Sequence, residues 1–343
     1  MTLTEGIFTS ADKKTEISYS VYTPDERPMA VVQLIHGMCE YVDRYKYLAE
    51  YLTSNGIVFC GADNLGHGRS AKSEDDLGFS GDNDGAENMI EDTRQLYQIM
   101  RKKYRRLPYI MLGHSMGSFI LRAYMTRYGD TEDSLGTRLD GAVITGTNSG
   151  DAPIKVALFL SKLMIKLRGP RYRSKLLRNI VFKDYNKKFP KDGEYGWLTR
   201  DSEIRKEYAA DPKCSFMFTA AGYRDMLTIL KEVTDESWAA SVPLSLPVFV
   251  IGGSDDPVGN YGNAPRVVAD ALRDAEVNEV DVKVYEGYRH ELFFEVGREN
   301  VCADLVEFVN KVAEGVHEAR MSAAINGFHV PLTTMGDYED KKD

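Results

Sequence analysis

The stretch at residues 109–119, Y-I-M-L-G-H-S-M-G-S-F, restricts the possible folds of this chain more than any other. Four apolar residues, 109–112, enter a turn in which glycine stands two positions before and two positions after a serine. The residues that follow, 119–123, can continue as a helix. A buried strand, a sharp turn and a helix are therefore predicted here.

Residues 113–117 match the pattern G-x-S-x-G, in which a serine occupies a strained turn and its Oγ stands clear of the sheet. A side chain two residues before or after that serine would strike the neighbouring strand or helix, so glycine is needed at both places. The pentapeptide alone also suits an ordinary glycine-bounded turn, but the strand before it and the helix after it favour the catalytic interpretation. Ser115 is therefore the candidate nucleophile, and the N–H of Met116 a candidate donor to a developing oxyanion.

Strand-like and helix-like segments alternate along most of the chain. Apolar or alternating runs predict strands at residues 6–10, 16–22, 30–35, 57–62, 109–112, 139–145, 247–252 and 280–285. Amphipathic helices are predicted between several of these strands, and a last one near residues 301–312. This alternation indicates parallel βαβ units, so the predicted fold class is α/β, with a doubly wound and mostly parallel sheet.

The alternation stops between residues 149 and 242. This length is too great for one connection, so we predict a separate, mainly helical insertion. The chain then divides into a first core part (1–148), a cap or lid (149–242), a second core part (243–315) and a C-terminal extension (316–343). The pattern weakens beyond residue 315, and the acidic, polar end at 336–343 is predicted to be flexible.

The first part of the insertion differs from the rest of the chain in charge. Residues 151–190 contain 11 Lys or Arg against two Asp, a balance of +9, whereas the whole chain carries −9. Its first helical stretch is apolar around most of its circumference. One interpretation is a lid whose apolar residues, among them Phe159 and Leu163, line an acyl-chain groove while the basic rim meets an anionic headgroup or a membrane surface. The other is a helix packed on the core with its lysines in water.

Composition and charge exclude several classes of function. The chain is 43% hydrophobic and 28% charged, as is typical of a globular enzyme, and its net charge of −9 does not suggest a nucleic-acid partner. It shows neither a basic and apolar leader nor a run of about eighteen apolar residues, so we expect a cytoplasmic protein that does not span a membrane. Its four cysteines lack C-x-x-C spacing, which argues for free thiols and against a zinc site.

Three loops provide the groups that would activate a serine. In an open α/β sheet the chemistry gathers at the carboxyl ends of the strands, and loops in such positions carry Ser115, then Asp255 or Asp256, then His290. The serine needs an imidazole to take its proton, and the imidazole needs a carboxylate to hold its tautomer. Either aspartate is possible, since one of them could merely cap the following turn; we favour Asp256.

A second oxyanion donor is expected in the loop after the strand at residues 30–35. Gly37 gives the backbone room to approach, and Met38 would supply the N–H. A metalloprotease site is not supported, because position 294 is Phe where H-E-x-x-H requires a second histidine. No metal and no cofactor are expected.

Five motifs together resemble the α/β-hydrolase superfamily, and within it the monoacylglycerol lipase and lysophospholipase branch that is often grouped with serine aminopeptidases. They are H-G-M-C-E-Y-V-D-R-Y at 36–45, D-N-L-G-H-G-R-S at 63–70, G-H-S-M-G-S at 113–118, S-D-D-P-V-G at 254–259 and Y-E-G-Y-R-H-E-L at 285–292. The resemblance implies Ser115 as nucleophile, His290 as base and Asp256 as acid, with Met38 and Met116 as oxyanion-hole donors. The cap is longer and more basic than in the mammalian-type monoacylglycerol lipases, so the chain resembles the bacterial lysophospholipase-like members more closely.

The activity expected from this resemblance is hydrolysis of monoacyl lipid esters, lysophospholipids or monoacylglycerols, through an acyl-enzyme that water then cleaves. A short-chain carboxylesterase or a peptidase of the same fold is one alternative; a peptidase would want acidic groups in the cap to anchor a free amine, and the basic first part of the cap does not favour it. A catalytically silent hydrolase fold that binds a small molecule is another, and loss of a triad member would favour it. We expect a small lipid or ester as ligand and contact with a membrane through the basic cap; the oligomeric state is left open.

Overall fold

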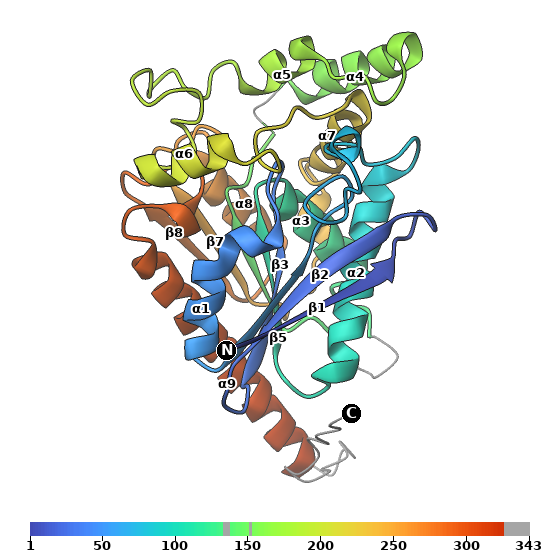
Figure 1. The fold of residues 1–343 in the computed structure, drawn as a ribbon. Coiled ribbons are helices and arrows are strands. Elements are labelled where there is room, and N and C mark those ends of the chain that lie inside the picture. The colour runs from blue at the N-terminus through green and yellow to red at the C-terminus, as the bar shows by residue number, and fades with distance from the viewer. Residues whose placement is uncertain (133–137, 151–152, 326–343) are drawn as a thin grey trace.

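The computed structural model describes residues 1–132, 138–150 and 153–325, and within them an eight-stranded sheet forms the centre of the molecule (Figure 1). The strands are β1 (Thr2–Thr9), β2 (Glu16–Thr23), β3 (Ala30–Ile35), β4 (Ile57–Ala62), β5 (Tyr109–His114), β6 (Gly141–Thr145), β7 (Val248–Gly253) and β8 (Val280–Tyr285). Their order is β1-β2-β4-β3-β5-β6-β7-β8. The pairs from β4 to β8 are parallel, and β2 runs antiparallel to both of its neighbours. The predicted fold class is therefore confirmed.

The strands of the sheet centre are apolar on both faces because helices cover both. Every residue of β3, β5, β6 and β7 is buried. By contrast, β1 begins at Thr2 rather than at residue 6, where the strand was predicted to start. Its first half is exposed and pairs with β2 through the backbone, so no apolar pattern marks it in the sequence.

Helices pack on the two faces of the sheet. The core helices are α1 (Lys46–Ser54), α2 (Gly85–Lys103), α3 (Met116–Tyr128), α8 (Asn263–Asp274) and α9 (Arg298–Ile325). Apolar residues of α1 and α9 join one buried cluster, and those of α2, α3 and α8 join the other. Short 3-10 helices lie at η1 (Val42–Tyr45), η2 (Glu74–Asp76), η3 (Trp238–Ser241) and η4 (Leu292–Phe294). The sheet is thus held between two apolar layers, with its loops free at either edge.

The insertion between β6 and β7 is helical, as predicted. It contains α4 (Ile154–Arg168), α5 (Lys175–Phe182), α6 (Ser202–Ala210) and α7 (Ala220–Glu232), with α4 and α5 at the top of the molecule in Figure 1. Three of these helices begin at side-chain caps, provided by Ser174, Asp201 and Thr219. α7 packs against α2 and α3 as well as α4, so it connects the cap to the core.

The last helix is longer than the sequence pattern indicated. α9 runs through Gly315 to Ile325, past the boundary expected at residue 315. The flexibility predicted for residues 336–343 lies outside the described residues. Within the described part of the chain, none of the helices combines the length and apolar character that crossing a bilayer requires.

Candidate active site

Ser115 lies in the turn between β5 and α3, and its backbone conformation is strained. Its φ of 52° and ψ of −120° belong to a region that residues with side chains rarely adopt. A Cβ on Gly117 would collide with the carbonyl oxygen of Ile35 in β3, so the elbow is as tight as its glycines suggested. The strand, turn and helix predicted at residues 109–119 are therefore present, with Ser115 on the wall of a pocket.

His290 and Asp256 meet although they are 34 residues apart in the chain. His290 follows β8, Asp256 follows β7, and both are almost fully buried. The Nδ1 atom of His290 lies 3.0 Å from Oδ1 and 3.1 Å from Oδ2 of the carboxylate. The N–H of Val258 also donates to Oδ1 of Asp256 (2.9 Å), and this bond helps to hold the carboxylate in place. Of the two candidate aspartates, Asp256 is the one in contact with the imidazole, while Asp255 is half-buried.

The two residues predicted to donate to an oxyanion lie in the same pocket as Ser115. Met38 and Met116 both line the same pocket as Ser115. Among the described residues, neither backbone N–H has a hydrogen-bond acceptor. A Cβ on Gly37 would lie 2.9 Å from Cβ of Ser115, so the loop after β3 reaches the elbow only because position 37 lacks a side chain. The arrangement leaves two backbone donors available beside the serine.

The buried Glu40 carboxylate holds this loop in place. It accepts a very short hydrogen bond from the N–H of Gly37, and further bonds from His114 Nδ1 (2.7 Å) and the Tyr45 hydroxyl (2.9 Å). Arg44 lies 3.2 Å from Glu40, which is 1% exposed. One carboxylate therefore links the loop after β3 to His114, the residue before Ser115.

Charges in this network support one another. Burial alone would raise the pKa of Glu40, but His114 and Arg44 hold the pKa of that carboxyl below its ordinary value. For His114 the directions are reversed: burial alone would lower the pKa of the imidazole, but the Glu40 carboxylate raises it above its ordinary value. Arg44 also makes a double hydrogen bond to Glu291 (2.9 and 3.1 Å), the residue after His290. The network thus connects the loops after β3 and β8 with the last residue of β5.

Sequence reasoning missed Glu40 and His114 as parts of the site. Glu40 lies within the H-G-M-C-E segment and His114 within the elbow itself, so each was next to an assigned residue. An acidic residue in the middle of an otherwise apolar loop was the available signal. Their contact depends on β3 and β5 being neighbours in the sheet, which the sequence did not specify residue by residue.

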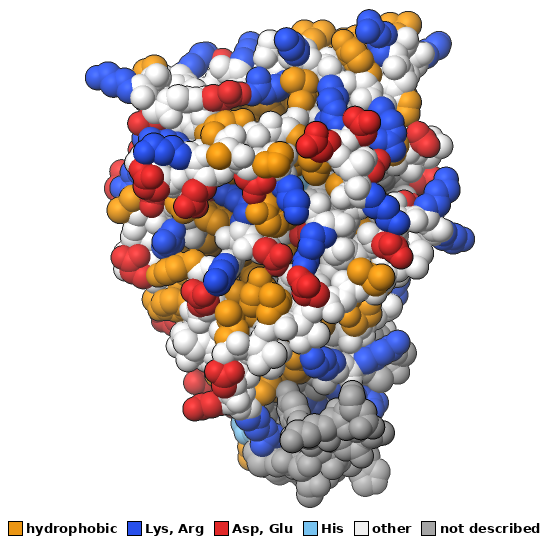
Figure 2. Space-filling view, in the orientation of Figure 1, with side chains coloured by type: hydrophobic (Ala, Val, Ile, Leu, Met, Phe, Trp, Pro, Cys, Tyr) orange, Lys and Arg blue, Asp and Glu red, His pale blue; other side chains and the backbone are white. Residues whose placement is uncertain are grey.

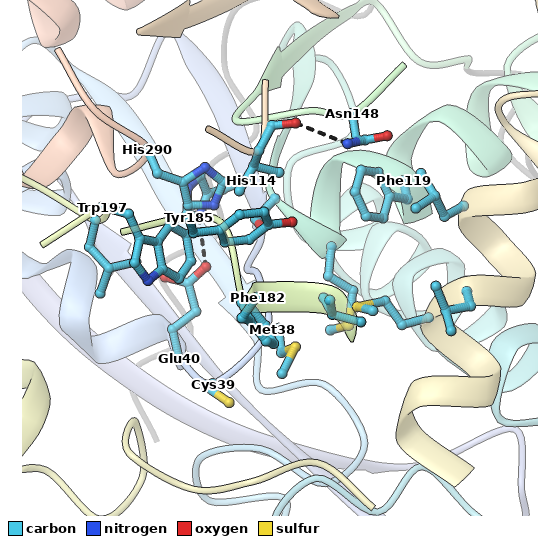
Figure 3. A pocket seen from close by; sticks show the side chains of 18 of the residues that line it. Met38, Cys39, Glu40, His114, Phe119, Asn148, Phe182, Tyr185, Trp197 and His290 are labelled. Carbon is cyan, nitrogen blue, oxygen red and sulfur yellow. Dashed lines mark hydrogen bonds and ion pairs between the residues drawn. The ribbon is translucent and has the colours of Figure 1, made fainter. Parts of the chain in front are cut away.

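The pocket at Ser115 is bounded on one side by polar and aromatic groups and on the other by apolar ones. Figure 3 shows His290, Tyr185, Trp197 and Glu40 on one side, with Phe119 on the other. Trp197 of the cap lies with its ring centroid 5.0 Å from that of His290. The apolar wall comes from the cap and from α3, and comprises Phe119, Ile154, Ala157, Ile180, Val181, Met226, Leu227 and Leu230. We call this part of the pocket the apolar arm.

Phe159 and Leu163, expected on a substrate groove, do not line this pocket. Phe159 is 66% exposed, and Leu163 is half-buried elsewhere on α4. The same helix instead contributes Ile154 and Ala157. The prediction named the helix that lines the pocket but not the residues on it that do so. Because nearly the whole circumference of α4 is apolar, the sequence does not reveal which side of the helix faces the core.

Comparisons with known proteins agree with this geometry. The family model described as "Serine aminopeptidase, S33" matches residues 26–297. The chain belongs to this family. It is 30% identical over 293 residues to a monoacylglycerol lipase of Mycolicibacterium smegmatis, covering 85% of this chain and 92% of that one. It is 24% identical over 278 residues to a phospholipase of Bacillus subtilis, covering 80% and 93%.

A solved structure is also similar over nearly the whole length. The thermostable carboxyl esterase from Bacillus coagulans superposes with a TM-score of 0.82 at 28% identity, covering 91% of this chain and 99% of that one. The predicted α/β-hydrolase fold and the predicted relationship to monoacylglycerol lipases are confirmed. The class of enzyme is a serine ester hydrolase.

Proposed function

We propose that Ser115 is the nucleophile of a lipid esterase, with His290 as its general base and Asp256 as the carboxylate that orients His290. The hydrogen bonds between His290 Nδ1 and Asp256 carry the proposal, because they leave Nε2 as the nitrogen that can take a proton from a serine. The hydroxyl oxygen attacks the ester carbonyl, and the N–H groups of Met38 and Met116 stabilise the oxyanion. Protonated His290 then protonates the leaving alcohol, and water cleaves the acyl-enzyme by the same route.

The substrate that we propose is a monoacyl lipid ester. The apolar arm runs from Phe119 along the cap helices, which suits one acyl chain. The relatives named as a monoacylglycerol lipase and a phospholipase support lipids as the class, and the similar carboxyl esterase structure keeps a short-chain ester as the second candidate.

We further propose that the cap contacts a membrane surface. Four large apolar side chains on α4 and α5 are at least half exposed: Val156, Phe159, Leu167 and Leu176. Figure 2 shows hydrophobic atoms interspersed with Lys and Arg along the top of the molecule, where Figure 1 places α4 and α5. Apolar residues within a basic surface are typical of peripheral binding to anionic bilayers. A cytoplasmic location fits the four buried, unpaired cysteines.

A fluorophosphonate probe tests the chemistry. We expect it to label the wild-type chain and not Ser115→Ala, while Ser118→Ala, a buried serine three residues further on, is still labelled. Equal labelling of wild type and Ser115→Ala would contradict the nucleophile and favour a silent binding fold. Hydrolysis of lysophosphatidylglycerol, monoacylglycerol, short aryl esters and aminoacyl amides under one condition tests the substrate class. Preference for acetyl esters over long acyl chains would instead support the short-chain esterase.

A further inference from the structure

A second cleft shares part of its wall with the pocket at Ser115. It has a volume of about 570 Å³ and lies between α5, the segment at residues 194–197 and the segment at residues 214–217. Five residues belong to the walls of both spaces: Met38, Cys39, Phe182, Trp197 and Tyr208. We call this space the second cleft. The two spaces are therefore adjacent.

The second cleft is polar and cationic where the apolar arm is not. Arg178 on α5 and Lys183, the residue that ends this helix, line it, and the carboxylate of Glu194 forms a close ion pair with Arg178. That pair is exposed on both sides, so it is weak and its arginine can exchange partners. Two fully or almost fully buried residues of its wall, Cys39 and Tyr223, mark the inner end of the cleft.

Tyr223 supplies an independent observation at the inner end. It is fully buried, it belongs to the wall of the second cleft, and its hydroxyl has no hydrogen-bond partner among the described residues. A buried hydroxyl without a partner costs free energy, so such a group calls for an explanation. A polar ligand group that enters the inner end would supply the missing partner.

We propose that the second cleft binds the phosphate-bearing headgroup of a lysophospholipid while the acyl chain occupies the apolar arm. The inference rests on the proposed function, because it assigns the leaving alcohol of that reaction to this cleft. The guanidinium of Arg178 and the ammonium of Lys183, which line the same cleft, suit phosphate oxygens.

The test compares two lipids with the same acyl chain, palmitoyl lysophosphatidylglycerol and monopalmitoylglycerol. We expect Arg178→Gln to lower the ratio of kcat/KM for the first over the second about tenfold, because a charged hydrogen bond is lost with only one of them. Arg171→Gln is the matched control, since Arg171 is also a cap arginine paired with a carboxylate but does not line the cleft. It should leave the ratio unchanged.

Tyr223→Phe separates binding from structure. Removal of an unpartnered hydroxyl should leave the free energy of unfolding unchanged or slightly higher, whereas KM for the lysophospholipid should rise about threefold relative to KM for monopalmitoylglycerol. A ratio that changes in neither variant overturns the headgroup assignment. A second result would also overturn it. Inorganic phosphate would inhibit monopalmitoylglycerol hydrolysis in wild type but not in Arg178→Gln, while the ratio of kcat/KM for the two lipids stayed the same in both. The cleft would then bind a free anion and not a headgroup. A wild-type chain that hydrolyses neither lipid contradicts the proposed function itself.

Discussion

Charged side chains are mostly buried and paired in the core loops around Ser115, whereas in the cap they are mostly exposed. In the core, Glu40, Arg44 and Glu291 are buried and paired with one another, and Asp256 is buried against His290. In the cap, lysines and arginines point outward beside exposed apolar residues such as Phe159. Buried pairs fix positions, while exposed cations and apolar groups favour contact with whatever approaches. The comparison assigns the chemical step to the core and the selection of substrate to the cap.

The largest effect is expected at the carboxylate of the triad. Asp256→Asn should lower kcat on the order of a thousandfold or more, because an amide can donate to His290 and stabilise the wrong tautomer. Asp255→Asn, one residue away, should retain most of the activity, since Asp256 rather than Asp255 contacts the imidazole. Steady-state kinetics with a soluble aryl ester measure both variants. If the two lost the same activity, the assignment of the acid would be wrong.

Glu40→Gln should show that the core network positions the oxyanion loop. The carboxylate that holds Gly37 and His114 would lose its charge, so we expect kcat to fall by roughly tenfold to a hundredfold and the free energy of unfolding by about 3 kcal/mol. KM for a soluble ester should change much less than kcat.

The cap offers a matched control for that variant. Glu203 on α6 forms an ion pair with Lys206, and both side chains are 71% exposed. Glu203→Gln should change neither the kinetics nor urea denaturation noticeably, because exposed pairs contribute little. If Glu203→Gln were as damaging as Glu40→Gln, the contrast between core and cap would fail.

The sequence predicted the core part of the site better than the cap. The elbow at Ser115 was predictable because a strained turn requires glycines at fixed positions, and His290 because few histidines follow the aspartates. The loop residues by themselves left both Asp255 and Asp256 possible, and it was the family resemblance that favoured Asp256. Only the fold determines which carboxylate meets the imidazole.

The cap was the less predictable part. Its helical character and charge followed from composition, but α4 is apolar on nearly every side, so the pattern did not identify Ile154 as facing the pocket and Phe159 as facing solvent. The second cleft could not be predicted at all. It brings together Cys39, Arg178 and Tyr223, which follow one another along the chain at intervals of 139 and 45 residues.

Lowering the pH should reduce the free energy of unfolding through a histidine of the core, His67. Burial lowers the pKa of His67 to about 3, whereas an unfolded histidine titrates near 6.5. Between these values the unfolded chain binds a proton that the folded chain does not, so the free energy of unfolding decreases as pH falls, by about 2 kcal/mol at pH 5. Residues 149–242 contain no histidine, so the cap has no such group.

Urea denaturation at pH 7 and pH 5 measures this difference. In His67→Phe the loss of stability between the two pH values should be about 2 kcal/mol smaller than in wild type. The replacement ring would still pack against Phe216 and Phe218. His317→Gln, on an exposed part of α9, should keep the wild-type loss. An unchanged loss in His67→Phe would mean that His67 does not stay neutral in the folded chain.

The smallest effect is expected on the outer surface of the cap, and it is selective for lipid surfaces. Phe159→Ser should raise KM about fivefold, equivalent to about 1 kcal/mol, for monoacylglycerol presented in anionic vesicles. Because Phe159 is 66% exposed and absent from the pocket wall, kcat and KM for a soluble aryl ester should not change. Ile7→Ser is the control, since Ile7 is 63% exposed but lies on β1, far from the cap in sequence and in the sheet order. A loss of activity toward the soluble ester would mean that Phe159 moves into the pocket during turnover, and the division between a core that reacts and a cap that selects would then have to include motion of α4.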